Sequence, residues 1–369
     1  MTSKPQPRAG VEKIMPYKPG DSSVEGVSDI IKLASNESPL GASPKAIAAV
    51  RAAAEHMELY PDGGATDLRA AIAKSYGLDA ALIVAGSGSE QVLGLLASAY
   101  AGPGDDVLYS EYGFLVYKIA SLAAGANIVV AKEKNFTTDV DALLAAVTPA
   151  TKIVFLANPN NPTGTWVSTS EIRRLRAGLA DHVLLVLDAA YAEYVENDDY
   201  SAGHSLVDEA ISNGTENVVV CHTFSKIYGL AAARVGWCYG PASVVDALNR
   251  VRGAFNVNAL GQVAAIAALE DTAHVDQARD LNNIELPRIE GLLRDMGLEP
   301  TPSVCNFILV HFPKGADQAA RADAYMRSKG VIVRPVAGYG MPQALRITIG
   351  TIEQNNRMAS NLQEFMSKE

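Results

Sequence analysis

A single lysine, Lys226, stands among the apolar and small residues of the stretch CHTFSKIYGLAAARVGW, residues 221–237. Burying a lysine costs free energy unless another group compensates for it. Thr223 and Ser225 lie just before this lysine, and Arg234 follows it in the same stretch. The stretch therefore offers an amine nucleophile beside two hydroxyls and a guanidinium that could bind an anion.

Asp188 is a carboxylate at the end of an apolar run, HVLLVLD at residues 182–188. Lys226 follows another apolar run, NVVVCHTF at residues 217–224. Taken alone, the aspartate could be a turn residue and the lysine a surface residue. In parallel sheets, however, ligands bind at the carboxyl ends of strands, so both side chains could reach one small ligand.

Pyridoxal 5′-phosphate (PLP) is a ligand that needs this pair, because its aldehyde requires an amine and its ring nitrogen a carboxylate. Lys226 would hold the aldehyde as a Schiff base and, once released, act as general base and acid. The phosphate needs a cradle, and AGSGSEQVLGLLASAY at residues 85–100 runs from a glycine-rich turn into a helix. Amide groups at that helix start, around Ser89 and Glu90, could bind phosphate.

The elements that must position these residues alternate along the chain. Short apolar runs predict buried strands at residues 106–110, 127–131, 152–158, 182–188 and 217–224, with helical segments between them. Continuous apolar strands alternating with helices indicate an α/β fold with a mostly parallel sheet that helices cover on both faces.

The two ends of the chain have different patterns. The first 35 residues are rich in proline and polar groups, which favours an extended arm. After a long helical stretch around residues 257–296, fewer strands with mixed spacing indicate a smaller α+β domain. We therefore expect an arm at 1–35, a large cofactor-binding domain at 36–255 and a small domain at 256–369.

Composition narrows the class of protein. The chain has 369 residues, a net charge of −10 and no basic block, which argues against nucleic acid or an anionic membrane as partner. The three cysteines have no metal-ligand or disulfide spacing, so no metal is expected. The absence of an apolar signal segment or membrane span makes the cytoplasm the expected location.

Several stretches together resemble one family. TFSKIYGLAAAR, NPNNPTG, DAAY and LRITIG are similar to the signatures of the fold-type I, class I/II aminotransferases. The resemblance implies that Lys226 forms the Schiff base and that Asp188 pairs with the ring nitrogen. Tyr191 and Asn161 would donate to the phenolic oxygen of PLP. The implied phosphate ligands are Ser89, Glu90, Thr223, Ser225 and Arg234.

The same resemblance implies further contacts. Tyr112 resembles the aromatic ring that stacks on the cofactor. Tyr60 resembles a tyrosine that reaches the phosphate from the neighbouring subunit, which implies a homodimer with shared active sites. Arg334 and Arg346 resemble the arginines that bind the anionic group of the substrate, and Tyr17 resembles an arm tyrosine that closes over it.

LASNESPLG, YPDGGATDLR, FNVN and AGYGMPQALRITIGT resemble the histidinol-phosphate aminotransferases within the family. This resemblance implies transamination of L-histidinol phosphate with 2-oxoglutarate, which yields glutamate, in histidine biosynthesis. An aromatic amino-acid aminotransferase or a dual-specificity enzyme is the nearest alternative. More distant alternatives are a decarboxylase of a phosphorylated threonine, a PLP-binding regulator and a dehydrogenase.

Overall fold

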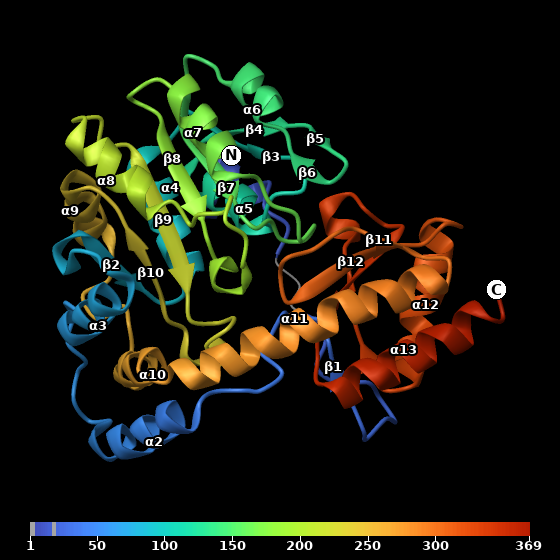
Figure 1. Ribbon diagram of the computed structural model, residues 1–369. Coiled ribbons are helices and arrows are strands. Elements are labelled where there is room, and N and C mark those ends of the chain that lie inside the picture. The colour runs from blue at the N-terminus through green and yellow to red at the C-terminus, as the bar shows by residue number, and fades with distance from the viewer. Residues whose placement is uncertain (1–3, 17–19) are drawn as a thin grey trace.

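A computed structural model describes residues 4–16 and 20–369 and contains two main sheets (Figure 1). The larger sheet has seven strands in the order β2-β10-β9-β8-β7-β3-β4, and the smaller has four in the order β11-β12-β15-β14. The long helix α11 (Thr272–Asp295) runs below both sheets in Figure 1. The predicted α/β fold with a mostly parallel larger sheet is confirmed.

The seven-stranded sheet is parallel except at β10, which is antiparallel to both of its neighbours. Its strands are β2 (Ile83–Gly86), β3 (Asp106–Ser110), β4 (Asn127–Ala131), β7 (Thr151–Ala157), β8 (Leu184–Asp188), β9 (Val218–Thr223) and β10 (Gly236–Tyr239). The five predicted strands are present with small differences at their ends. The strands β2 and β10, of four residues each, were not predicted.

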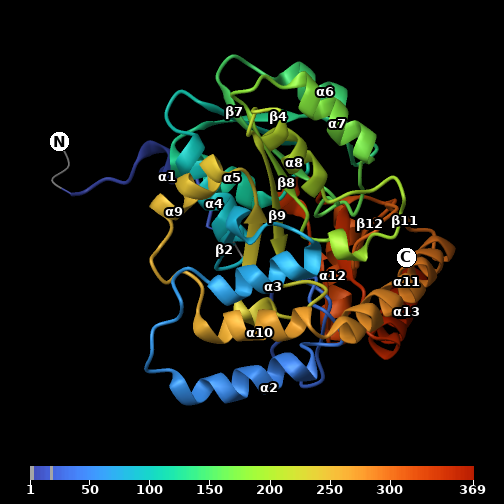
Figure 2. The same cartoon turned by 60° about the vertical axis from the view of Figure 1, so that its left-hand side comes forward.

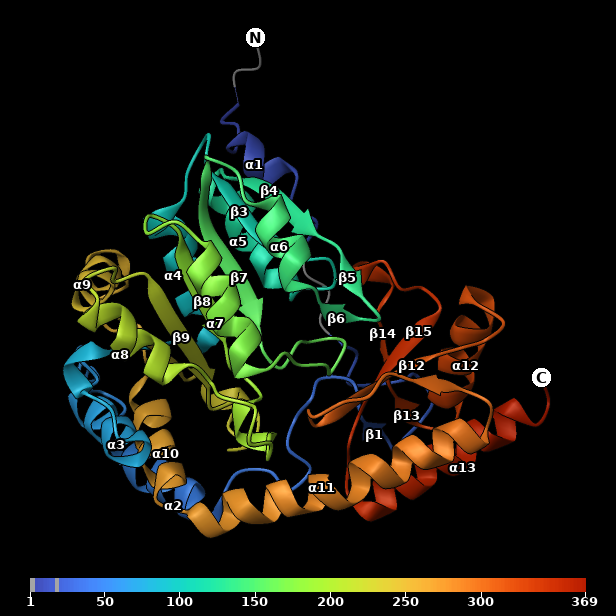
Figure 3. The same ribbon diagram turned by 45° about the horizontal axis from the view of Figure 1, so that its top comes forward.

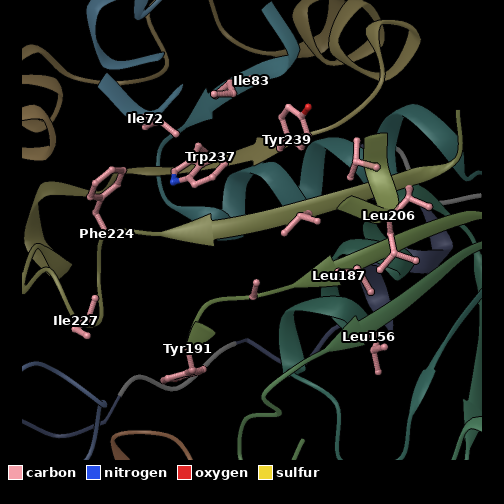
Figure 4. Packing of buried hydrophobic residues seen from close by; sticks show 14 of the residues in the cluster. Ile72, Ile83, Leu156, Leu187, Tyr191, Leu206, Phe224, Ile227, Trp237 and Tyr239 are labelled. Carbon is pink, nitrogen blue, oxygen red and sulfur yellow. The ribbon is translucent and has the colours of Figure 1, made fainter. Parts of the chain in front are cut away.

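Helices cover both faces of this sheet because strand residues alternate between two apolar clusters. In β9, Val218 and Val220 enter one cluster, while Val219 and Cys221 enter the other. Figure 4 shows the first cluster from close by, with Leu187 and Leu206 among its members. The large-sheet helices are α3 (Thr66–Tyr76), α4 (Ser89–Tyr100), α5 (Leu115–Ala124), α6 (Val140–Ala146), α7 (Thr169–Gly178), α8 (His204–Ser212) and α9 (Ala242–Val251).

Two further helices extend this part of the molecule. Figure 2 shows α3, α10 (Ala259–Leu269) and α2 (Pro44–Ala53) stacked below the sheet. The Ser43 hydroxyl accepts a hydrogen bond from the amide of Ala46 and caps α2, whose first residue is Pro44. Within residues 4–16 and 20–369, no helix combines the length and the apolar character needed to cross a membrane.

The smaller sheet is antiparallel and packs on helices of the C-terminal part (Figure 3). Its strands are β11 (Glu299–Pro300), β12 (Phe307–His311), β14 (Arg334–Pro335) and β15 (Ala344–Thr348), with α12 (Ala316–Ser328) and α13 (Ile352–Met366) beside it. Near the chain start, β1 (Ile31–Lys32) pairs with β13 (Val331–Ile332), and a short helix, α1 (Ala9–Glu12), interrupts the predicted extended arm. The predicted domain boundaries stay a prediction.

Candidate active site

A cavity of about 260 Å³ lies where the carboxyl ends of β7, β8 and β9 face the smaller sheet. Ala157, Asp188 and Thr223, at or near the ends of those three strands, line one wall. Arg334 and Arg346 of the smaller sheet line the other. The predicted site residues that line this cavity are Ser89, Glu90, Asn161, Asp188, Tyr191, Thr223, Ser225, Lys226, Arg234, Arg334 and Arg346.

Lys226 follows the end of β9, and its Nζ donates to the carbonyl oxygen of Ser35 at 3.4 Å. Part of its side chain faces the cavity, but protein atoms surround the amine on the other sides. This burial, together with the positive charge of Arg346, lowers the pKa of Lys226 to about 8. A substantial fraction of the amine is therefore neutral near physiological pH and can act as a nucleophile.

Asp188 is the last residue of β8 and is only 5% exposed. The hydroxyl of Tyr117, from α5, donates to Oδ2 at 2.8 Å. Oδ1 is buried and has no hydrogen-bond partner among the described residues. Burial raises the pKa of Asp188, and the Tyr117 hydrogen bond acts against that rise. A protonated ring nitrogen would supply the missing partner of Oδ1.

The start of α4 provides an anion-binding position. The helix begins at Ser89 after Gly88, whose φ of 83° is in the left-handed region. A Cβ at Gly88 would lie 2.4 Å from an Arg234 guanidinium nitrogen, and one at Gly236 would lie 2.1 Å from the Ser89 amide nitrogen. Glycine at both positions therefore lets the helix start and the guanidinium approach one point, where a phosphate can bind.

Polar side chains at and after the end of β9 lie beside this anion-binding position at the start of α4. Arg234 donates to the Ser225 hydroxyl at 3.4 Å, and its guanidinium lies 3.9 Å from the Glu90 carboxylate. The Thr223 hydroxyl accepts the Ser225 amide at 3.1 Å. The two hydroxyls and the guanidinium thus lie close to the helix start.

Tyr191 and Asn161 lie between the two walls. Asn36, which sequence reasoning missed, donates from Nδ2 to the Tyr191 hydroxyl at 2.7 Å, so the hydroxyl hydrogen of Tyr191 remains available to donate. Asn161 accepts from Arg346 through Oδ1, which leaves its amide hydrogens for another acceptor. Both peptide bonds before Pro159 and Pro162 in this loop are cis.

Arg334 and Arg346 are directly opposite each other in the antiparallel pair β14–β15, so their side chains lie on the same face of the sheet. Arg346 is 7% exposed, donates to the Ala34 carbonyl at 2.9 Å and lies over the ring of Phe307. Its Nε is buried without a partner in the part of the chain that the structure describes. This donor is available to an anion in the cavity.

Two of the predicted site residues that the structure describes do not line the cavity. The ring of Tyr112 packs on Phe136 with centroids 5.7 Å apart, whereas the nearby Phe114 lines the cavity. Tyr60 is 82% exposed and stacks on Phe255, which is compatible with a contact to another subunit. Tyr17 lies outside the described residues. The predicted roles of these tyrosines stay predictions.

The donor set fits PLP. The unpartnered Asp188 oxygen suits the ring nitrogen, the glycine-lined start of α4 suits the phosphate, and Lys226 supplies the amine for the aldehyde. Sequence reasoning missed Asn36, Phe114 and Tyr117. Of these, Phe114 sits two residues from the predicted aromatic position, whereas Asn36 and Tyr117 gave no local signal of their partners.

Comparisons with known proteins show the family of the chain. The family described as "Aminotransferase class I and II" matches residues 28–362. Histidinol-phosphate aminotransferases from Rhodopseudomonas palustris and Paramagnetospirillum magneticum are 52% and 54% identical to the chain, over 99% and 98% of it and 100% and 99% of their own lengths.

Solved structures are similar as well. The histidinol-phosphate aminotransferase from Sinorhizobium meliloti, in complex with PLP, superposes with a TM-score of 0.85 at 30% identity and 91% coverage of both chains. Aspartate aminotransferase from Thermus thermophilus, at 21% identity and a TM-score of 0.79 over 91% of this chain and 92% of that one, shares the fold. The chain therefore belongs to the class I and II aminotransferase family and is a PLP-dependent aminotransferase.

Proposed function

We propose that this enzyme transfers the amino group of L-histidinol phosphate to 2-oxoglutarate, a step of histidine biosynthesis. The observation that carries the proposal is identity above 50% with histidinol-phosphate aminotransferases over nearly the full length of both chains. The cavity supports it, because two arginines face Lys226 from one wall. A guanidinium binds a phosphate and a carboxylate equally well, as an enzyme with these two substrates needs.

The chemistry divides between cofactor and protein. When bound, PLP supplies an aldehyde for the substrate amine and a ring that accepts the electron pair released at Cα. Lys226 would hold the aldehyde at rest, and its freed amine would take the proton from the substrate Cα and return it on the cofactor side. Asp188 keeps the ring nitrogen protonated, and Tyr191 and Asn161 donate to the phenolic oxygen.

The test of the proposed substrate compares kcat/KM for L-histidinol phosphate and for phenylalanine, each with 2-oxoglutarate as acceptor. We expect the phosphate substrate to be preferred, because Arg334 and Arg346 would pair with its anionic group. Equal values would indicate a dual-specificity enzyme. An absence of turnover with histidinol phosphate would refute the proposal.

We also propose that the enzyme acts as a homodimer in which Tyr60 of one subunit contacts the phosphate site of the other. Exposed apolar side chains around Tyr60 support this, namely Met57, Leu59 and Phe255. Mixing Lys226→Ala subunits with Tyr60→Ala subunits should restore activity, since one site of each hybrid has both residues intact. An active monomer in sedimentation analysis would contradict the proposal. The predicted cytoplasmic location stays a prediction.

A further inference from the structure

Tyr117 and Asp188 form a buried pair in which one carboxylate oxygen of Asp188 is hydrogen-bonded to Tyr117 and the other has no partner among the described residues. The Tyr117 side chain is fully buried, and its hydroxyl donates to Oδ2 of Asp188 at 2.8 Å. The other oxygen, Oδ1, is buried without a partner among the described residues, and Asp188 lines the cavity. We propose that Tyr117 is a positioning residue that holds Asp188 ionised, with Oδ1 directed to the ring nitrogen of PLP.

Packing makes Tyr117 suitable for this role. Its ring stacks on Phe155 of β7 with centroids 4.7 Å apart and planes 3° from parallel. Its edge meets Phe114, which itself lines the cavity, at 6.0 Å. One face of the ring is stacked on Phe155 and Phe114 meets the ring nearly at a right angle, so packing restricts the position of the hydroxyl. A carboxylate held through one oxygen cannot rotate away from the cavity without losing that hydrogen bond.

The charges around Asp188 explain why the carboxylate needs this donor. Burial raises its pKa, and the contacts that oppose the rise are the Tyr117 hydroxyl, the Ala190 amide, His222 and Lys226. Burial and the nearby Asp188 charge hold the pKa of Tyr117 well above its usual range, so this hydroxyl stays protonated and can only donate here. A hydrogen bond to a buried charged group is among the stronger ones in a protein.

The inference rests on the proposed pairing of Asp188 with the ring nitrogen, so the experiment includes Asp188→Asn beside Tyr117→Phe. Phenylalanine keeps the stacked ring and removes only the hydroxyl. We expect the PLP dissociation constant, from equilibrium dialysis of the holoenzyme, to rise roughly tenfold or more in Tyr117→Phe. The visible absorption of the bound cofactor should titrate at a higher pH, because the ring nitrogen carries less positive charge.

Tyr109→Phe is the matched control. It removes the hydroxyl of a neighbouring buried ring, 5.9 Å from that of Tyr117, whose hydroxyl is not bonded to Asp188. We expect its cofactor affinity and its absorption titration to match the wild type. Equal changes in cofactor affinity and in the absorption titration for Tyr109→Phe and Tyr117→Phe would overturn the inference. The loss of a buried tyrosine hydroxyl near the site would then explain the result without the bond to Asp188.

A PLP analogue with carbon in place of the ring nitrogen provides a second test that does not depend on activity. Tyr117→Phe and the wild type should bind this analogue equally, because Asp188 has no ring proton to accept. If Asp188→Asn shifts the absorption titration and Tyr117→Phe does not, the inference fails while the role of Asp188 stands. If neither variant differs from the wild type with PLP, the proposed role of Asp188 fails as well.

Discussion

The two walls of the cavity are built differently. The wall from the larger sheet carries Lys226, Asp188 and Thr223 at or just beyond the ends of adjacent parallel strands, above two apolar clusters. The wall from the smaller sheet carries Arg334 and Arg346 on two short antiparallel strands. In the proposed reaction, the first wall would meet the same cofactor in every turnover, whereas the second would have to accept substrates with different anions.

The two arginines of the second wall differ as well. Arg346 is buried, bonded to Asn161 and Ala34, and packed on Phe307. Arg334 is half-buried and also lines a neighbouring cavity of about 580 Å³, together with Lys118 and Arg327. Burial therefore differs between the two arginines, with Arg346 the more buried of the pair. We expect the effects of substitution to decrease from Lys226, the proposed Schiff-base lysine, through Arg346 to Arg334.

The largest effect is expected from substitution of Lys226. Lys226→Ala removes the amine that we propose binds the aldehyde and moves the Cα proton, so turnover should fall roughly 10³-fold or more. The holoenzyme should also lose the visible absorption band of the bound cofactor. Lys74→Ala, an exposed lysine on α3, is the control and should leave both unchanged. A variant at Lys226 that keeps full turnover would contradict the assignment.

The sequence predicted the first wall better than the second. Apolar runs that end in a polar residue located β8 and β9, and with them Asp188 and Lys226. The strands β2 and β10 were missed because four residues give too short a pattern to distinguish a strand from a loop. For the arginines, only the resemblance to a family gave a role, and the sequence did not indicate that they are opposite each other.

Contacts between distant segments were beyond prediction. Asn36 and Tyr191 are 155 positions apart in the chain, and Tyr117 and Asp188 are 71 apart. Neither pair has a local pattern, because each forms only when the sheet and its helices have packed. Tyr112 and Phe114 illustrate the same limit, since the conformation of one turn decides which aromatic ring lines the cavity.

The next largest effect is expected in the pH dependence of PLP capture by Lys226, on the wall from the larger sheet. Only a neutral amine attacks the aldehyde, and burial lowers the pKa of Lys226 to about 8. At pH 7 the neutral fraction should therefore exceed that of an ordinary lysine by roughly two orders of magnitude. We expect the rate at which apoenzyme captures PLP to rise with pH to a midpoint near 8. Pyridoxamine 5′-phosphate, which has no aldehyde, should bind without that midpoint.

A midpoint above about pH 10, where an unperturbed lysine titrates, would show that the cavity does not activate Lys226. It would also remove the contrast between the walls, because the lysine would then be as solvated as a surface side chain. The measurement is stopped-flow absorbance over a pH series, with the stability of the apoenzyme checked at each pH.

Arg346→Lys should have a smaller effect that is shared by both substrates. Lysine cannot replace the planar guanidinium that bonds Asn161 and Ala34 and still offers a donor to the cavity. We expect KM for histidinol phosphate and for glutamate to rise by roughly 10- to 100-fold, with a smaller change in kcat. Arg250→Lys, on the exposed face of α9, is the control. Unchanged KM values would place the anion site elsewhere.

Arg334→Lys should have the smallest effect and the most selective one. Arg334 is half-buried and borders the neighbouring cavity as well as the candidate site. We therefore expect the longer substrate to place its phosphate nearer to Arg334 than glutamate places its carboxylate. KM for histidinol phosphate should therefore rise by roughly three- to tenfold, and KM for glutamate should rise less. Steady-state kinetics with each substrate in turn measures this ratio. Equal increases in KM for both substrates would mean that the two arginines bind both anions alike. The proposed difference between Arg346 and Arg334 would then be wrong.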